Sequence, residues 1–215
     1  MKGVKFGEHH TYDTWGLLMT PNWEIGLPEI KEKKIDIEGA DGEKDYTEFF
    51  GGVKYGNRTL KWEFVYPKLI SGNSFMQKVS EIADAVHGRK LSIRWDNDPD
   101  YVYTGRVKVS SFAVKDGIGT IEISADAEPY KMKVEKTAIS AVLNGVNDIY
   151  LGNSRKSVVP EITTDTAVTI KFGESIFSHA AGTFRIPELQ LEEGENLLTV
   201  TGTGNIKFEY REGRI

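Results

Sequence analysis

Apolar and polar residues alternate in many short runs along this chain, and only one stretch has the spacing of a helix. A period of two residues is typical of a half-buried β-strand. The clearest run is residues 60–66, in which Lys61 and Glu63 lie on the polar face. Its apolar face consists of Leu60, Trp62, Phe64 and Tyr66. The pattern therefore predicts a mainly β protein.

Other alternating runs predict strands before and after this one. They are residues 4–6, 15–19, 90–95, 101–114 and 118–127. Turn residues at 96–100 and 115–117 join the last three runs, so we expect a meander of hairpins there. Pro21 and Pro28 bracket a segment with Trp23. We expect this segment to be an edge strand or a connection, because proline cannot donate a hydrogen bond to a neighbouring strand.

Residues 35–66 contain two β-type runs, 35–37 and 60–66, around a wide excursion rich in glycine and charge. Residues 39–42 predict a turn, because an Asp-Gly pair supplies the positive φ that the turn needs. The excursion also carries the charged residues Asp41, Asp45, Glu48 and Arg58. Since it is too long for a plain hairpin loop, we expect it either to cover its own domain or to contact a neighbouring subunit.

Residues 74–87 have the pattern of an amphipathic helix. Ser74 is the expected N-cap, with Gln77 three residues later in a capping-box arrangement, and Gly88 is placed to end the helix. The apolar face consists of Phe75, Val79, Ile82 and Val86. One such helix beside many strands predicts a lid packed on one face of a sheet.

The composition changes near residue 132. All four tryptophans precede this point, and a second series of short strands follows it. These strands are expected at residues 158–162, 167–172, 183–186, 196–201 and 206–210, with turns at residues 144–145, 193–194 and 202–204. Short strands at this spacing are typical of a β-sandwich or jelly roll. We therefore expect two β-sandwich domains, residues 1–132 with the helix and residues 133–215.

The net charge of −5 is spread evenly along the chain. Residues 1–132 carry 18 basic and 21 acidic side chains, and residues 133–215 carry 9 and 11. We therefore expect no basic face that captures nucleic acid. The absence of cysteine excludes disulfides and thiolate metal sites. No apolar run reaches the ~18 residues of a membrane span, and the first residues lack a signal-peptide core, so cytoplasmic synthesis without membrane insertion is expected.

Asp96-x-Asp98-x-Asp100 matches the opening of a calcium-binding loop. The next position should be glycine but is Tyr101, and Val107 occupies the position of the closing glutamate. We therefore interpret these residues as a hairpin turn and expect no metal site.

The histidines also give no metal site. His9 and His10 are adjacent, and adjacent side chains on a strand point to opposite faces, so exposure on the surface is expected. His87 lies at the C-terminal end of the predicted helix, where the helix dipole favours a positive charge. His179 is expected in a loop without an evident partner.

No catalytic motif is present: the chain has no G-x-S-x-G, no H-E-x-x-H and no cysteine nucleophile. Gly202-Thr203-Gly204 lacks the third glycine of a dinucleotide-binding loop, so no cofactor is expected. Among 32 acidic residues, nothing selects one carboxylate pair for sugar hydrolysis. A carbohydrate-binding module for cell-wall sugars stays open as the alternative function. The second domain has no tryptophan, and its aromatic residues mostly occupy alternating positions, where burial in the core is expected.

Several short segments together resemble the distal tail protein family of long-tailed phages and prophages of Gram-positive bacteria. They are Asp13-x-Trp15-Gly16-Leu17, residues 35–42, residues 45–48, Asn57-Arg58, residues 128–131 and residues 210–215. The resemblance extends over nearly the whole chain and is carried by the order and spacing of these segments.

The resemblance implies an N-terminal β-sandwich domain that closes as a hexameric ring and a galectin-like or jelly-roll C-terminal domain outside it. Such a ring is a structural hub of the virion tail that joins the tail tube to the tail tip or baseplate. DNA passes through its lumen without specific binding, and the protein is not an enzyme. Ring closure requires two different surfaces that meet between neighbouring copies. We expect Asp41, Asp45, Glu48 and Arg58 to form one of them.

Overall fold

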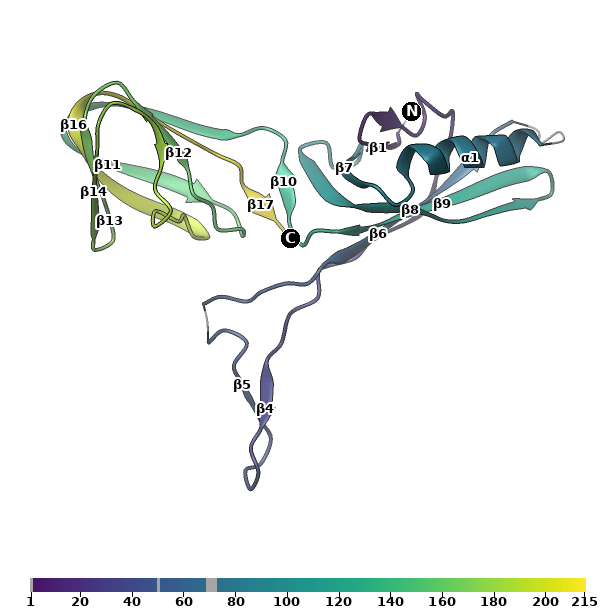
Figure 1. Cartoon of the computed structure of the whole chain (residues 1–215), viewed down its shortest axis with the longest axis horizontal. Coiled ribbons are helices and arrows are strands. Elements are labelled where there is room, and N and C mark those ends of the chain that lie inside the picture. The colour runs from purple at the N-terminus through teal and green to yellow at the C-terminus, as the bar shows by residue number, and fades with distance from the viewer. Residues whose placement is uncertain (1, 50, 69–72) are drawn as a thin grey trace. The chain divides into compact units, whose positions relative to one another are not determined.

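The computed structural model describes residues 2–49, 51–68 and 73–215. The described residues are mainly β and contain one helix, which confirms the predicted fold class (Figure 1). The chain divides into two compact units, residues 1–131 with Ile215 and residues 132–214.

The first unit contains an antiparallel sheet in the order β2, β1, β7, β8, β9, β6, β3. Its strands are β1 (Val4–Phe6), β2 (His9–His10), β3 (Leu18–Ile25), β6 (Arg58–Tyr66), β7 (Lys90–Trp95), β8 (Tyr101–Lys115) and β9 (Ile118–Ala127). The predicted meander of β7, β8 and β9 is confirmed. Pro21 lies in β3, an edge strand with a bulge, as its missing N–H requires.

The strand predicted at residues 15–19 begins only at Leu18. Gly16 has a φ of +68°, and its N–H donates to the carbonyl of Tyr12. The N–H of Leu17 donates to the carbonyl of Thr11. These local hydrogen bonds form turns before the strand, so the alternating pattern here reflects burial and not an extended backbone.

The sheet and the helix share one core. Leu60, Trp62 and Phe64 of β6 are fully buried, as the alternation predicts, and each buried side chain of this size contributes about 2 kcal/mol. The predicted helix face, namely Phe75, Val79, Ile82 and Val86 of α1 (Ser74–Val86), belongs to the same buried core. The helix lies along β8 of the sheet (Figure 1). Phe75 lies so close to β9 that only glycine fits at position 119, since a Cβ there would be 2.4 Å from its ring.

The N-terminus of the helix differs from the prediction. Asn73 and not Ser74 is the N-cap residue, and no side chain caps the helix there. The N–H of Gln77 donates to the Asn73 carbonyl at 3.0 Å, so Ser74 is already the first helical residue. The C-terminal prediction holds, because Gly88 follows the helix with a φ of +77°.

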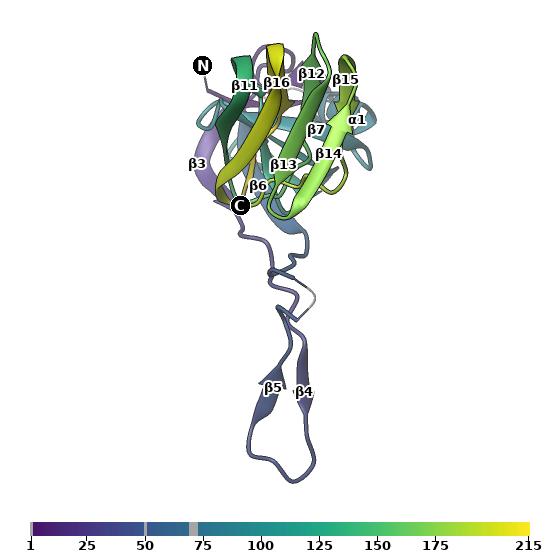
Figure 2. The same ribbon diagram turned by 90° about the vertical axis from the view of Figure 1, so that its left-hand side faces the viewer.

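Residues 35–37 do not pair with residues 60–66. Instead β4 (Lys34–Asp36) pairs with β5 (Glu43–Asp45) in a separate two-stranded sheet (Figure 2). All residues of both strands are exposed. The apolar and polar alternation at residues 35–37 therefore does not mark a half-buried strand.

The second unit contains a sheet in the order β14, β13, β16, β12, β15, with β11 paired along the other edge of β16. The strands are β11 (Thr137–Asn153), β12 (Glu161–Thr164), β13 (Val168–Phe172), β14 (Ser175–His179), β15 (Gly182–Arg185) and β16 (Gly194–Tyr210). Two short strands, β10 (Lys131–Lys133) and β17 (Gly213–Arg214), pair with each other.

Two predicted turns lie inside long strands. The turns expected at residues 144–145 and 202–204 face each other in the continuous 17-residue pair of β11 and β16. Gly145 pairs with Gly202, while Gly204 has a φ of +91° and Gly145 a φ of +80°. Glycines on both strands let the pair bend without losing register, so they do not end either strand.

Candidate interaction surfaces

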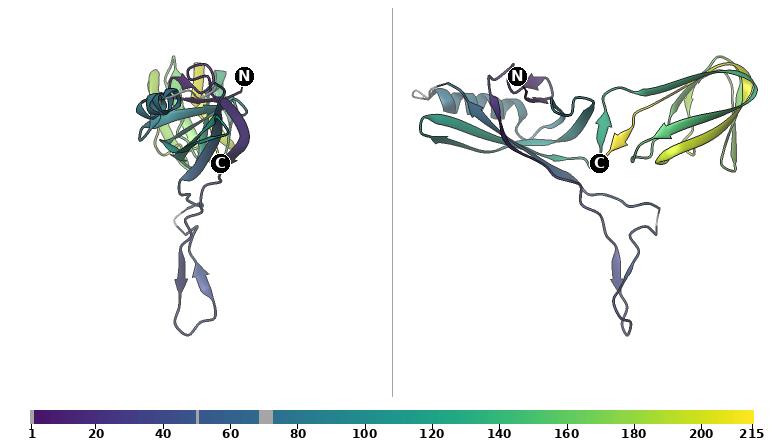
Figure 3. Two further views of the ribbon diagram at one scale, coloured as in Figure 1. Left: turned by 90° about the vertical axis from the view of Figure 1, so that its right-hand side faces the viewer. Right: turned by 180° about the vertical axis from the view of Figure 1, so that it is seen from behind.

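The longest connection between strands of the first sheet forms an arm, residues 27–57, between β3 and β6 (Figure 3). Its base is held by backbone hydrogen bonds. The Gly26 N–H donates to the Thr59 carbonyl and the Gly56 N–H to the Glu29 carbonyl, both at 2.8 Å. An antiparallel bridge joins Ile30 and Tyr55. Beyond this bridge, β4 and β5 pair only with each other.

Three of the four residues predicted to contact a neighbouring subunit lie on this arm, and all three are exposed. Asp41 lies in the turn at its tip, where Gly39 and Gly42 have positive φ. The side chain of Asp45 accepts a hydrogen bond from the Thr47 N–H at 2.8 Å, and hydrogen bonding to Thr47 lowers the pKa of that carboxyl. The backbone carbonyl of Glu48 accepts from Gly51.

The end of the arm is strongly acidic. Residues 36–48 carry one lysine, Lys44, and six carboxylates: Asp36, Glu38, Asp41, Glu43, Asp45 and Glu48. The register places Asp36 directly opposite Glu43. Like charges at directly opposite strand positions destabilise a hairpin.

The arm also exposes large apolar side chains. Leu27 is 75% exposed and Phe49 is 70% exposed, and Ile30 and Ile35 are also exposed. A two-stranded hairpin without a core is at best marginally stable in water. Exposed apolar residues on an extended hairpin are typical of a surface that another chain covers.

Arg58, the fourth predicted residue, does not lie with the other three. It is the first residue of β6 and only 4% exposed. Its Nε donates to the Gly26 carbonyl at 2.7 Å, its Nη1 donates to the Pro129 carbonyl at 3.4 Å, and its guanidinium lies over the Tyr103 ring. Burial lowers the pKa of Arg58. Arg58 therefore holds the base of the arm to the sheet of its own chain.

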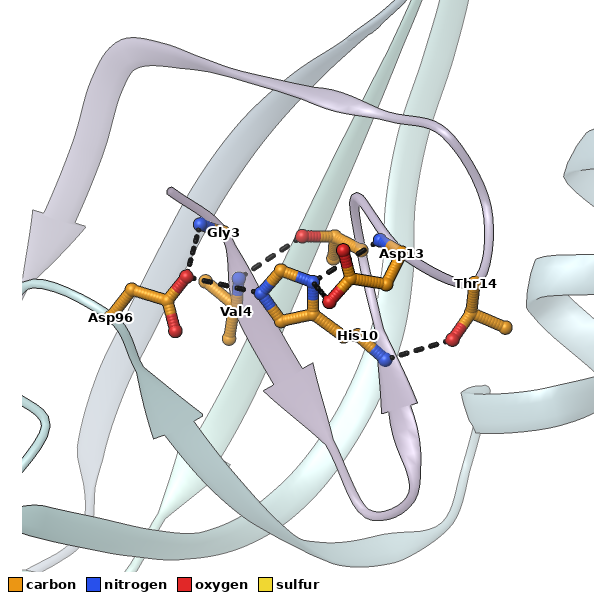
Figure 4. Close-up of polar contacts among 7 residues, drawn as sticks. Gly3, Val4, His10, Asp13, Thr14 and Asp96 are labelled. Atoms are coloured by element: carbon orange, nitrogen blue, oxygen red, sulfur yellow. Dashed lines mark hydrogen bonds and ion pairs between the residues drawn. The ribbon is translucent and has the colours of Figure 1, made fainter. Parts of the chain in front are cut away.

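His10 is not a plain surface residue. Its side chain is 15% exposed and lies between Asp13 and Asp96, as Figure 4 shows. His10 Nε2 lies 3.1 Å from Asp96 Oδ2, and the Asp13 N–H donates to His10 Nδ1. Asp96 Oδ2 also accepts from the Gly3 N–H at 2.8 Å. His10 therefore connects the N-terminal residues to the turn after β7. The sequence does not indicate this contact, because Asp96 is distant from His10 along the chain.

The aspartates at positions 96, 98 and 100 form the predicted hairpin turn. The Asp98 N–H donates to the Trp95 carbonyl, and the Tyr101 N–H donates to the Asp98 carbonyl. Asp98 forms an ion pair with Lys131 at 2.7 Å, whereas Asp96 binds His10. Because these two carboxylates bind different partners, they do not converge on one point. Within residues 2–49, 51–68 and 73–215, no group of histidines and acidic residues is arranged to hold a metal ion.

His87 and His179 also have partners in the structure. His87 is the C-cap residue of α1, and its Nδ1 accepts from the Val109 N–H at 3.2 Å. The loop predicted at His179 is wrong, because this residue ends β14. Its ring stacks on Phe184 with 4.1 Å between the ring centroids. Both side chains therefore contribute to packing.

The first sheet carries a cluster of cations that the even spread of charge along the sequence does not reveal. In the first sheet, the buried side chains of β1, β7 and β8 alternate with cations on the opposite face. These cations are Lys5, Lys90, Arg94, Arg106 and Lys108. They come from three strands, β1, β7 and β8, which are separate in the sequence. A count of charged residues along the sequence therefore does not show that they form one cluster. We call these five residues the basic face.

The second unit has an open groove of about 420 Å³ over β11, β16 and β12. Its polar lining includes Ser140, Thr163, Asp165, Asn205 and Lys207. Asp165 accepts two hydrogen bonds from Asn205 at 2.7 Å, and these lower the pKa of Asp165. Tyr150 occupies an alternating position, for which burial in the core is expected, but it is 58% exposed. It does not line the groove.

Glu212 organises the C-terminal end of the second unit. Its carboxylate accepts hydrogen bonds from Lys133, Thr137 and Ser154 at 2.5–2.6 Å. Burial alone would raise the pKa of Glu212, but these hydrogen bonds outweigh it and lower the pKa to about 2. No pattern in the sequence indicates this cluster, because its members are far apart along the chain.

Replacing Glu212 by glutamine is expected to lower the free energy of unfolding of the second unit by about 2 kcal/mol, since charge-assisted hydrogen bonds are lost. The pKa of Glu212 is lower in the folded chain than in the unfolded chain. The stabilisation is therefore complete above the unfolded pKa and is lost as the pH falls from about 5 toward 2. Urea unfolding followed by circular dichroism at pH 7 and pH 3 measures both effects. Equal losses at both pH values would contradict this role.

No described helix is long and apolar enough to cross a membrane. No family model matches the sequence, and no curated protein matches it either. The fold does match a solved structure. The crystal structure of the SPP1 Dit (gp 19.1) protein, described as a paradigm of the hub adsorption apparatus in phages that infect Gram-positive bacteria, superposes with a TM-score of 0.70. The match covers 98% of this chain and 99% of that chain at 14% sequence identity.

Proposed function

We propose that this chain is a structural component of a phage tail, and that its first domain assembles with further copies of itself into a closed ring. The observation that carries the proposal is the arm, an exposed acidic and apolar hairpin with no core of its own. The shared fold with the SPP1 Dit protein over almost the whole of both chains supports the same role.

The ring is proposed to contain six copies and to join the tail tube to the tail tip or baseplate of the virion. DNA passes through its lumen, and the second domain, residues 133–215, lies outside. The role is structural and requires no catalytic residue or cofactor. The partners are further copies of this chain, the tail-tube proteins and the tail-tip proteins. The arm with Asp41, Asp45 and Glu48 provides one side of the contact between copies.

Electron microscopy of the purified protein tests this proposal. Class averages should show closed rings of uniform copy number in a buffer of low ionic strength. Images that contain only separate single chains at concentrations of tens of micromolar would contradict it.

The alternative function, binding of cell-wall sugars, is favoured by one observation. The groove of the second unit is lined by hydroxyl, amide and carboxylate groups, which are the groups that bind sugar hydroxyls. Its lining lacks the aromatic platform that such sites usually contain. Titration with purified cell-wall polysaccharide, compared between the natural protein and Asp165→Ala, distinguishes the two functions. Saturable binding that Asp165→Ala abolishes would support the alternative.

A further inference from the structure

The basic face contains two pairs of like charges at directly opposite strand positions. Lys5 of β1 lies opposite Arg94 of β7, and Lys90 of β7 lies opposite Arg106 of β8. Such pairs destabilise a sheet. An anionic partner bound to this face would relieve the repulsion within both pairs.

The charges on this face are only partly neutralised within the chain. Lys5 forms an ion pair with Glu8 and Lys90 with Glu128. Among the described residues, Arg94, Arg106 and Lys108 form no ion pair with a carboxylate, and all three are exposed. Arg94 and Arg106 donate only to backbone carbonyls, those of Pro99 and Gly88.

The arm has the complementary arrangement. Asp36 lies opposite Glu43, and Asp41 lies in the turn beyond them. The basic face thus holds cations opposite cations, and the arm of the same chain holds carboxylates opposite carboxylates. Contact between the two surfaces would relieve the repulsion within each.

We propose that the acidic end of the arm of one copy binds the basic face of β1, β7 and β8 on the next copy. This inference rests on the proposed function, because it names the two surfaces that meet in the ring. The contact is heterologous, as ring closure requires, and the occupant of the basic face is a second copy of this chain.

The structure favours the arm over nucleic acid as this occupant. Glu8 and Glu128 lie among the cations of the face, and Asp126 lies directly opposite Arg106. Carboxylates within the face weaken binding to a continuous row of phosphates. A short hairpin carries carboxylates at only a few positions, so fewer of them would meet the carboxylates of the face.

Charge reversal in matched triple variants tests the contact. One variant carries Asp36→Lys, Asp41→Lys and Glu43→Lys on the arm, and the other carries Arg94→Glu, Arg106→Glu and Lys108→Glu on the basic face. All six positions are exposed, so folding should be retained, and far-UV circular dichroism checks this. Each variant alone should assemble at least ten-fold more weakly than the natural protein by light scattering.

Mixing the two variants provides the decisive measurement. The reversed arm of one variant matches the reversed face of the other, and the natural arm of the second matches the natural face of the first. An equimolar mixture should therefore recover assembly, and added salt should weaken it again. Lys136→Glu with Lys171→Glu, two exposed cations of the second unit, is the control and should assemble normally.

Four outcomes would overturn the inference. If the natural protein assembles and neither variant is impaired, the surfaces are wrong while the proposed function stands. If both variants are impaired but the mixture does not recover, arm and face do not bind each other. If a short DNA duplex binds the natural protein and the face variant loses this binding while its assembly is unchanged, nucleic acid is the occupant. A natural protein that never assembles overturns the proposed function together with the inference.

Discussion

Replacing Arg58 by alanine is expected to lower the free energy of unfolding of the first unit by about 3 kcal/mol. Arg58 is almost fully buried, and its guanidinium donates to the carbonyls of Gly26 and Pro129. Without it these carbonyls lose a donor, the contact with the Tyr103 ring is lost, and a cavity forms. The loss therefore combines unsatisfied polar groups with lost packing.

Urea unfolding followed by tryptophan fluorescence measures this change in the first unit, because all four tryptophans lie there. Arg89→Ala is the matched control. Its side chain is exposed and lies outside the basic face, so the free energy of unfolding should change by less than about 0.5 kcal/mol. If the Arg58 and Arg89 variants unfold at the same urea concentration, the structural role of Arg58 is wrong.

Shortening the arm is expected to abolish assembly while leaving the fold intact. Ile30 and Tyr55 already form an antiparallel bridge, so residues 31–54 can be replaced by Asn-Gly, which closes a two-residue hairpin. The shortened chain lacks the acidic end and the exposed Ile35 and Phe49. Light scattering should give the mass of one chain at concentrations where the natural protein is assembled.

The fold of the shortened chain should be unchanged, because none of the described residues between positions 31 and 54 belongs to the buried core. The control is the tryptophan unfolding midpoint at a concentration where the natural protein is also a single chain, because assembly itself stabilises the folded state. The two midpoints should then match. Normal assembly of the shortened chain would exclude the arm as the contact between copies.

Burial patterns predicted the individual elements well. In β6 the alternation gives the buried face of the strand, and in α1 the helical spacing gives all four residues that pack on the sheet. Both follow from one property of each side chain, namely whether it prefers water. The turn at Asp116 and Gly117 was predictable from another local property, the backbone conformation. Both residues have a positive φ, which an Asp-Gly pair tolerates.

Pairing between distant strands was not predictable in this way. Nothing local shows that β4 pairs with β5 rather than with β6, or that Gly145 and Gly202 bend one long strand pair. The basic face is a product of this pairing. Lys5, Arg94 and Arg106 are distant in sequence, and their charges cancel in any count along the chain.

Arg58 illustrates a second limit of sequence reasoning. It lies at the end of a charged, glycine-rich excursion, so its charge suggests exposure. The sheet register places it opposite Ala127 in the interior instead, where the Gly26 carbonyl binds it. Asp41, Asp45 and Glu48 have no such interior partner and stay exposed.

The mass of the natural protein in solution, measured by light scattering over a hundred-fold range of concentration, tests the central claim most directly. Six copies of a 24.1 kDa chain would give about 145 kDa. We predict that this mass is reached and then stays constant as concentration rises, because a closed ring has no free surface for a further copy. A mass of 24.1 kDa throughout the range, or a mass that grows without limit, would contradict the claim.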